Sequence, residues 1–268
     1  MKLALIAGNR ELPLAFLKCI ASSADVEVIP ICFKEETSAR IKQFAAKTYW
    51  LRVGQLQKLV DILKEENISQ CVMLGQISPW RIFQQQKWDS LMQELVQKTE
   101  YRPHALFTTF IEYLEIQGIR FLDSTSYMQN LLVGSGVLNQ VTVDKDLSCD
   151  IDFGIKLISR YVELDVGQTM VVKNKAVLAL EALEGTDNTI KRGYRIGKKG
   201  CVILKFSKKD QDLRFDVPVV GLSTLRLLKK IKAAALVLET SRVLILEKEK
   251  FLKEAQHDNI AVIGKTRM

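Results

Sequence analysis

The chain has few of the side chains that most often bind transition metals, and this narrows the possible functions. It has 268 residues but only two histidines, His104 and His257, which stand far apart in the sequence. Its five cysteines are scattered, include no Cys-x-x-Cys pair and mostly fall in apolar runs. These patterns argue against a histidine metal cluster, a zinc site or a disulfide framework, and they favour a reduced cytosolic protein with buried thiols.

Aromatic residues and long apolar runs are scarce as well. The net charge of +8 favours anionic partners, but with only 7% aromatic residues and no basic stripe interleaved with them, nucleic acid is the weaker choice. No window approaches the ~18 uncharged apolar residues of a membrane-spanning helix. Residues 1–7 are apolar but too short for a signal peptide. Any contact with a membrane is therefore expected from its surface.

The dinucleotide-binding fingerprint is missing from the first strand-to-helix turn. Gly8, Asn9 and Arg10 follow an apolar segment, but the second and third glycines of G-x-G-x-x-G are absent. This disfavours a nicotinamide-dependent dehydrogenase and leaves a nucleotide-binding variant of such a fold open. Arg10 is placed to meet an anion beside a helix amino terminus, or is simply a surface residue at a helix start.

In the first half, apolar segments that suit strands alternate regularly with segments of helical periodicity. The expected strands are residues 2–7, 26–33, 49–53, 71–74 and 119–122, and the expected helices are residues 11–21, 55–66, 88–99 and 105–117. Such alternation predicts an α/β fold with a mainly parallel sheet, whose ligands bind at the carboxyl ends of the strands. Gly8 and Gly75 mark two such ends.

The second half has a different order of elements. Residues 131–150 turn polar and glycine-containing, so we predict a first domain at 1–136, a linker at 137–149 and an α+β second domain at 150–268. A helix at 151–162 precedes a hairpin made by residues 166–172 and 176–182. A strand at 201–206 follows, and then a helix at 223–233.

The corner after the hairpin is one candidate site. Gly185 suits a positive φ, and Thr186 or Asp187 can cap the helix that follows. Such a corner can hold a phosphate on backbone N–H groups, or a metal on Glu181, Glu184 or Asp187. An ordinary capped helix after a hairpin is the competing interpretation, and spacing alone favours it.

Residues 208–221 are the other candidate. As a strand, this stretch places Asp212, Arg214 and Asp216 on one face and apolar side chains on the other. Carboxylates bind hard divalent cations and guanidinium groups bind phosphate, so the polar face suits a metal-assisted phosphate site. On a flat strand the Cα atoms of Asp212 and Asp216 would be ~13 Å apart. Either the backbone therefore bends near Pro218, or only one Asp binds metal; a solvated strand face is the alternative.

Several of these stretches together resemble a known family. Residues 164–168, 179–187 and 211–221, with Gly8, Leu12, Pro13 and Gly75 in the first half, are similar to the LpxI-type UDP-2,3-diacylglucosamine pyrophosphatases of lipid A synthesis. The similarity extends over essentially the whole chain. The first turn departs from the family pattern, because Gly8-Asn9-Arg10 replaces a run of glycines.

The resemblance implies a specific activity and architecture. It implies a magnesium-dependent hydrolase that converts UDP-2,3-diacylglucosamine to UMP and 2,3-diacylglucosamine 1-phosphate (lipid X) at the cytoplasmic face of the inner membrane. It also implies a Rossmann-like first domain, a family-specific second domain, a cleft between them and a homodimer. A non-catalytic carrier of the lipid-linked nucleotide sugar and a nucleotide-sugar oxidoreductase remain alternatives.

The residues expected to form the site follow from the motifs and the resemblance together. The expected catalytic residues are Asp216, Asp212 and Arg214, and the expected Mg²⁺ ligands are Asp216, Asp212, Asp187 and Glu181. The expected substrate-binding residues are Gly8, Asn9, Arg10, Gly75, Gln168, Gly185, Thr186, Lys205 and Arg192. The helix at 223–233, with an apolar stripe and basic neighbours, is a candidate acyl-chain groove, unless it packs on its own sheet.

Overall fold

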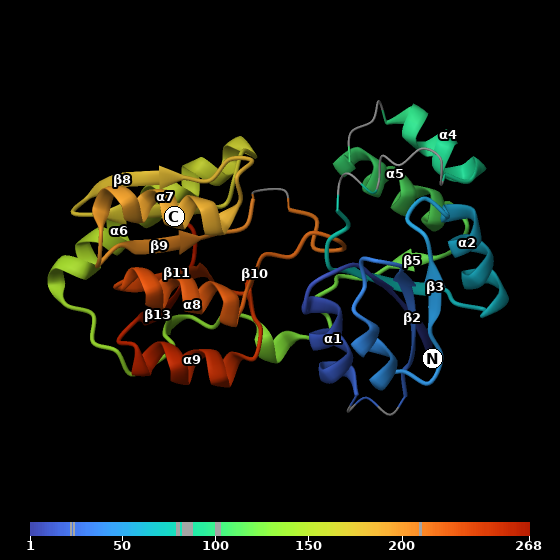
Figure 1. The fold of residues 1–268 in the computed structure, drawn as a ribbon, viewed down its shortest axis with the longest axis horizontal. Coiled ribbons are helices and arrows are strands. Elements are labelled where there is room, and N and C mark those ends of the chain that lie inside the picture. The colour runs from blue at the N-terminus through green and yellow to red at the C-terminus, as the bar shows by residue number, and fades with distance from the viewer. Residues whose placement is uncertain (22, 24, 79–80, 82–87, 100–102, 209–210) are drawn as a thin grey trace. The chain divides into compact units, whose positions relative to one another are not determined.

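The chain forms two compact units that do not follow the order of the sequence. A computed structural model describes residues 1–21, 23, 25–78, 81, 88–99, 103–208 and 211–268 (Figure 1). The first unit contains residues 1–128 together with 212–216, and the second contains 129–211 and 217–268. The sequence placed the boundary at 137–149 and assigned the whole later half to one domain. In the structure, a short piece of that half belongs to the first unit.

The first unit is built on a five-stranded parallel sheet of order β3-β2-β1-β4-β5. The strands are β1 (Lys2–Ala7), β2 (Glu27–Phe33), β3 (Tyr49–Leu51), β4 (Gln70–Leu74) and β5 (Arg120–Phe121). The helices are α1 (Leu12–Ile20), α2 (Leu56–Glu65), α4 (Ser90–Lys98) and α5 (Pro103–Ile116), with a 3₁₀ helix at Ala39–Gln43. The predicted parallel, Rossmann-like sheet is confirmed.

Burial explains why these segments form parallel strands. Residues 3–7 of β1 are all buried, which requires cover on both faces of the sheet. On one face, α2, α4 and α5 share a core with Ile6, Ile31 and Met73. Because β1 lies between β2 and β4, the connections diverge there, at the position where ligands bind in such folds.

The second unit is a mixed sheet of six strands in the order β6-β13-β11-β9-β7-β8. Its strands are β6 (Gly136–Val137), β7 (Thr169–Lys173), β8 (Ala176–Leu180), β9 (Val202–Lys205), β11 (Ala235–Glu239) and β13 (Ala261–Lys265). The central strands β9, β11 and β13 are parallel, whereas β6, β7 and β8 pair antiparallel at the edges. The mixed α+β character predicted for this half is confirmed.

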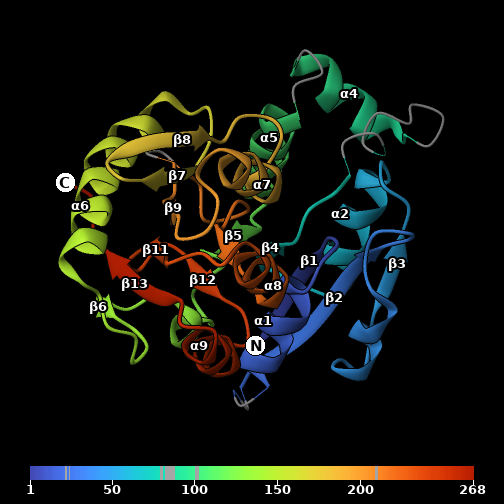
Figure 2. The same ribbon diagram turned by 60° about the vertical axis from the view of Figure 1, so that its left-hand side comes forward.

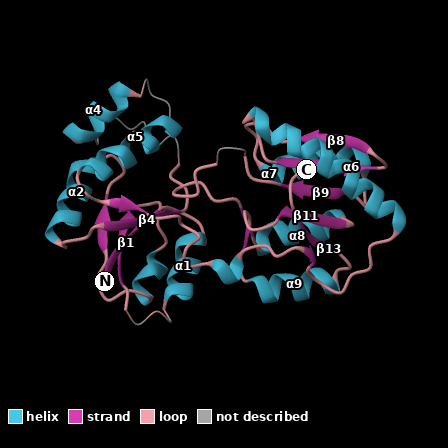
Figure 3. Cartoon of the chain, turned by 180° about the vertical axis from the view of Figure 1, so that it is seen from behind, coloured by secondary structure: helices cyan, strands magenta, loops and turns pink. Residues whose placement is uncertain are grey.

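Helices cover both faces of this sheet, as Figure 2 and Figure 3 show from two further sides. The helices are α6 (Lys145–Tyr161), α7 (Thr186–Gly197), α8 (Leu222–Ile231) and α9 (Lys248–His257). Short 3₁₀ turns lie at Gln129–Leu131 and Val162–Leu164, and β10 (Val219–Val220) pairs with β12 (Leu244–Ile245). Side chains of α6 pack on one face of the large sheet, and those of α7, α8 and α9 pack on the other.

Two predictions about the second half are changed by this packing. Helix α6 begins at Lys145, because the Asp144 carboxylate accepts a hydrogen bond of 2.8 Å from the Leu147 N–H, so part of the predicted linker is helical. The apolar stripe of α8, made by Leu225, Leu228 and Ile231, is buried in the core of its own unit. That helix is not an exposed acyl-chain groove.

Among the described residues, no helix has the length and apolar character needed to cross a lipid bilayer.

Candidate functional site

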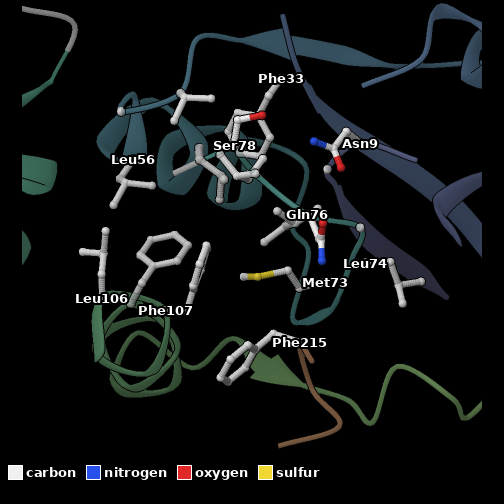
Figure 4. Close-up of a pocket in the computed structure, with 18 of the residues that line it drawn as sticks. Asn9, Phe33, Leu56, Met73, Leu74, Gln76, Ser78, Leu106, Phe107 and Phe215 are labelled. Carbon is white, nitrogen blue, oxygen red and sulfur yellow. The ribbon is translucent and has the colours of Figure 1, made fainter. Parts of the chain in front are cut away.

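A cavity of about 630 Å³ opens at the carboxyl ends of the strands in the first unit. Figure 4 shows its lining, which is mostly apolar and includes Phe33 of β2, Met73 of β4 and Phe107 of α5. The apolar lining residues are Ile6, Phe33, Val53, Leu56, Leu59, Met73, Leu74, Ile77, Met92, Leu106, Phe107, Phe110 and Phe215. A mostly apolar cavity of this size with a few polar groups is typical of a small-molecule binding site.

Two of the predicted binding glycines let strand ends approach at the cavity. The Asn9 N–H donates to the Gln76 carbonyl at 2.7 Å. A Cβ on Gly8 would lie 2.5 Å from that carbonyl oxygen, and a Cβ on Gly75, whose φ is +89°, would lie 2.5 Å from the Asn9 carbonyl oxygen. Both glycines line the cavity, as do Asn9 and Arg10. Close backbone approach therefore explains why glycine is required at both positions.

The Asn9 side chain gives the cavity one of its few polar groups. Its Nδ2 donates to Glu36 Oε2 at 2.6 Å, and Glu36 is also paired with Arg81. Its Oδ1 is buried and has no hydrogen-bond partner among the described residues. Such an orphaned acceptor is available to a donor on a ligand.

The stretch predicted as a strand around Asp212 is a turn. Phe215 N–H donates to the Asp212 carbonyl at 3.2 Å and Asp216 N–H donates to the same oxygen at 2.9 Å. The backbone bends within 212–216, not near Pro218. It also belongs to the first unit, where Phe215 and Asp216 line the cavity. The strand prediction was wrong because period-2 alternation over five residues does not exclude one helical turn.

Arg214 is engaged by carboxylates. Its Nε and Nη2 contact Asp212 at 3.0 and 2.7 Å, and its Nη1 contacts Glu115 of α5 at 2.9 Å. Its pKa is raised, chiefly by the hydrogen bond to Asp212. Asp216 has no ion-pair partner among the residues the structure describes. Of the two predicted acidic residues in this turn, Asp216 is in the cavity lining and Asp212 is not.

The second unit holds a buried polar cluster at the start of α7. Lys205, at the end of β9, is 5% exposed, and its ammonium donates to the Thr186 hydroxyl at 2.7 Å. Thr186 Oγ1 is 3.2 Å from Glu181 Oε1 and 3.2 Å from Thr169 Oγ1. These distances fit a Thr186 oxygen that accepts from Lys205 and Thr169 and donates to Glu181. Gly185 precedes the helix with a φ of +79°, as expected.

Two side chains in this region have unsatisfied oxygens. Glu181 is buried, and its Oε2 has no hydrogen-bond partner among the described residues, as is the case for Gln168 Oε1. The Tyr161 hydroxyl donates to the Glu181 carbonyl, and its pKa is raised by burial and by the nearby Glu181 and Glu184 charges. A buried carboxylate oxygen without a protein donor is open to an external partner, such as a water molecule, a cation or a ligand hydroxyl.

Asp187 and Arg192 lie at the surface of the same helix. Arg192 pairs with Glu184 and donates to the Leu180 carbonyl at 2.6 Å, and this pairing lowers the pKa of Glu184 to about 2. The side chain of Asp187 is exposed. Arg192 is therefore engaged by protein groups in the structure, whereas Lys205 is the buried cation at the start of α7.

The four predicted metal ligands fall into two groups. Asp212 and Asp216 belong to the first unit, and Glu181 and Asp187 belong to the second. No group of three or more His, Cys, Asp or Glu side chains able to hold a metal occurs among the described residues. The magnesium ligand set stays a prediction.

Some contributors to these sites were not anticipated from the sequence. Phe33 and Phe107 line the cavity, and Thr169 is fully buried beside Thr186. In sequence, the two phenylalanines look like ordinary core positions on a strand and a helix. Thr169 had a signal, since a threonine at the start of an apolar strand needs a buried hydrogen-bond partner.

Comparison with known proteins finds a match for each half of the chain. Residues 2–131 match the LpxI N-terminal domain and residues 134–263 match the LpxI C-terminal domain. The chain is 24% identical, over 98% of its length and 97% of the relative's, to the UDP-2,3-diacylglucosamine pyrophosphatase LpxI of Caulobacter vibrioides.

Solved structures show only slight overlap. One is a biotin carboxylase domain of a thermophilic 2-oxoglutarate carboxylase, with 10% identity, a TM-score of 0.27 and coverage of 63% of this chain and 34% of that one. Another is a glycinamide-RNase-transformylase T from Mycobacterium tuberculosis, with 11% identity, a TM-score of 0.24 and coverage of 68% and 44%. Overlaps this low bear on neither fold nor function.

Proposed function

The chain belongs to the LpxI family, and on that premise we propose that it hydrolyses the diphosphate bond of UDP-2,3-diacylglucosamine to UMP and 2,3-diacylglucosamine 1-phosphate. The observation that carries the proposal is the apolar cavity of about 630 Å³ in the first unit, whose lining includes Asp216. An amphiphilic substrate with a reactive polar group needs this combination of surfaces.

The cavity is assigned to the acyl chains. Its walls are aromatic and aliphatic, and each methylene that enters them from water contributes about 0.8 kcal/mol. A cavity at this edge of a parallel sheet would ordinarily receive a nucleotide, but here the glycine fingerprint is absent, and among the described residues Arg10 is the one cation in the lining. Asn9 and Gln76 supply the few polar contacts that the sugar and its amide or ester groups require.

The polar cluster of the second unit is assigned to the diphosphate. Lys205 supplies a buried positive charge, and the amino terminus of α7 at Thr186 presents backbone N–H groups. Both favour an anion. Gln168 and Gly185 belong to the same corner and are assigned as further substrate contacts.

Asp216 is assigned as the group that accepts the proton of the attacking water. The water oxygen forms a bond to phosphorus, the phosphoanhydride P–O bond breaks, and the leaving phosphate carries away the electron pair. A positioned general base contributes about 10²–10⁴-fold to such a rate. Asp212 and Arg214 hold the turn that carries Asp216, because their charges are satisfied by each other.

Magnesium is proposed as the cofactor. In enzymes of phosphate chemistry, Mg²⁺ is commonly bound by one or two carboxylates plus substrate phosphates. The unpartnered Glu181 Oε2 fits that donor set, and Glu181 with Asp187 would hold the ion in the second unit. The ion would neutralise negative charge on the phosphoryl oxygens. Lys205 and Thr186 would orient the diphosphate beside it.

The substrate's acyl chains also bear on where the protein acts and how it assembles. We infer a peripheral association with the cytoplasmic face of the inner membrane, since the acylated sugar partitions into the bilayer. A homodimer is proposed from the family relationship. Sedimentation with vesicles and light scattering on the purified chain measure these two properties directly.

The test is a discontinuous assay with purified protein, MgCl₂ and UDP-2,3-diacylglucosamine in detergent micelles. We expect equimolar UMP and 2,3-diacylglucosamine 1-phosphate, both lost with EDTA and restored by added Mg²⁺. UDP-N-acetylglucosamine, which has no long acyl chains, should not be cleaved at comparable concentration. Tight binding of the diacylated substrate without any UMP would instead identify a carrier and would overturn the proposal.

A further inference from the structure

We propose that Ser124 and Glu115 are positioning residues for Asp216, acting through the turn of residues 212–216. This inference rests on the proposed function, since it concerns the geometry of that hydrolysis. Neither residue lines the cavity. Both contact the backbone or side chains of the turn that brings Asp216 to the cavity.

Ser124 fixes the backbone of the turn at two consecutive carbonyls. Its N–H donates to the Leu213 carbonyl at 3.0 Å, and its hydroxyl lies 2.7 Å from the Arg214 carbonyl. The residue is fully buried, with 0% exposure. Two hydrogen bonds from one buried residue hold the backbone of the turn in place.

The same hydroxyl ties the turn to the sheet. Ser124 Oγ also lies 2.9 Å from the carbonyl of Met73, near the end of β4 and in the cavity lining. A serine hydroxyl has one proton, so it donates to one of these two carbonyls at a time. Ser124 therefore lies between the turn and the strand end that forms the cavity wall, within hydrogen-bond distance of both.

Glu115 contacts the turn through the side chain of Arg214. It contacts Arg214 Nη1 at 2.9 Å, while Arg214 uses its other nitrogens on Asp212. The rings of Phe107 and Phe215 stack nearby, with centroids 6.0 Å apart and an interplanar angle of 28°. Helix α5 therefore contacts the turn through an ion pair and through a ring.

These contacts matter because the turn is a short insertion from the other unit. The chain leaves the second unit after Gln211 and re-enters it at Val217, so 212–216 are the only residues after Met128 that belong to the first unit. A segment of five residues has few contacts within itself, so its position depends on the residues of the first unit that it contacts. A displacement of about 1 Å in a catalytic group is enough to lower a rate by about 10²-fold.

The experiment compares four variants of the full-length protein. Ser124→Ala removes the hydroxyl, Ser124→Cys keeps a weaker donor of similar size, and Glu115→Gln removes one charge. Glu112→Gln is the matched control, since Glu112 is exposed on the same helix and has no ion-pair partner in the described part of the chain. Each is measured for kcat, for KM and for amide hydrogen exchange of residues 213–217.

We expect kcat to fall about 10- to 100-fold in Ser124→Ala, with KM changed less than twofold, since the turn and not substrate binding is disturbed. Ser124→Cys should recover part of kcat, Glu115→Gln should lose about threefold, and Glu112→Gln should match wild type. The Phe215 and Asp216 amides should exchange faster in Ser124→Ala, while those of β1 and β4 stay protected. If Ser124→Ala does not fold, Ser124→Cys and Glu115→Gln carry the same comparison.

Unchanged kcat in both Ser124 variants, or equal loss of protection throughout the first unit, would overturn the inference. A wild-type protein that releases no UMP would overturn the proposed function instead. In that case the exchange data still decide whether Ser124 holds the turn, because they do not depend on turnover.

Discussion

The two candidate regions use opposite chemistry at similar places in their folds. In the first unit, the carboxyl ends of parallel strands surround a cavity with mostly apolar walls. In the second, the end of β9 and the start of α7 enclose a lysine, two threonines and a carboxylate. A strand end beside a helix amino terminus therefore does not predict its ligand by itself. The side chains that fill the corner decide between lipid and anion.

The first prediction tests the apolar region by removing the side chain of Asp216, the acidic residue in the cavity lining. Asp216→Ala should lower kcat by about 10²- to 10⁴-fold, because a positioned general base supplies a rate factor of that size. The melting temperature should be nearly unchanged, since Asp216 makes no ion pair among the described residues. Asp61→Ala, on the exposed surface of α2, is the control. Surviving activity would show that Asp216 is not the base.

The second prediction tests the polar region of the second unit through Lys205. Lys205→Met keeps the length of the side chain and removes its charge, so kcat/KM should fall about 10- to 100-fold, as loss of a charged hydrogen bond worth about 1.5–3 kcal/mol implies. Lys199→Met, at an exposed position, should behave as wild type. Full activity in Lys205→Met would show that the diphosphate does not bind at this cluster. Unfolding should be measured alongside, because Lys205 also bonds to Thr186.

The third sharpens the assignment of the cavity to acyl chains. Leu56→Trp should fill part of the cavity and raise KM for the diacylated substrate about tenfold, with a smaller change in kcat. The matched control is Ile116→Trp, because Ile116 is 82% exposed in the same unit. If the KM of Leu56→Trp equals that of wild type, the chains bind elsewhere.

The smallest effect is expected at the surface of the polar region. Arg192→Ala should reduce kcat/KM only about two- to threefold, since exposed ion pairs contribute little. The pKa of Glu184 should rise from about 2 towards its ordinary value. A lowered folded-state pKa stabilises the fold above the ordinary carboxyl range and loses that effect as pH falls through the folded value. The difference in melting temperature between Arg192→Ala and wild type should therefore shrink between pH 5 and pH 2.

An outcome in the opposite direction would be equally informative. If Arg192→Ala loses activity as severely as Lys205→Met, Arg192 leaves Glu184 to bind substrate. Arg195→Ala, on the same exposed helix surface, controls for a general change of charge.

Much of the fold was predictable because strand and helix signals are local. The apolar segments of the first half became β1, β2, β3 and β4, since buried parallel strands need apolar residues on both faces. The hairpin of β7 and β8 and the corner at Gly185 were likewise visible from turn chemistry. At that corner the structure brings together Thr186 and Glu181, which the sequence analysis had placed there, and Lys205, which it had not; their roles stay predictions.

By itself, the sequence determined the parallel sheet, the mixed second half and the family to which the chain belongs. Only the tertiary structure decided that residues 212–216 form a turn in the first unit and that Asp216 lines an apolar cavity. It also decided that Ser124 bonds to Arg214, 90 positions away. Burial patterns repeat over a few residues and can be read locally, whereas these contacts join distant segments whose meeting depends on how the whole chain packs.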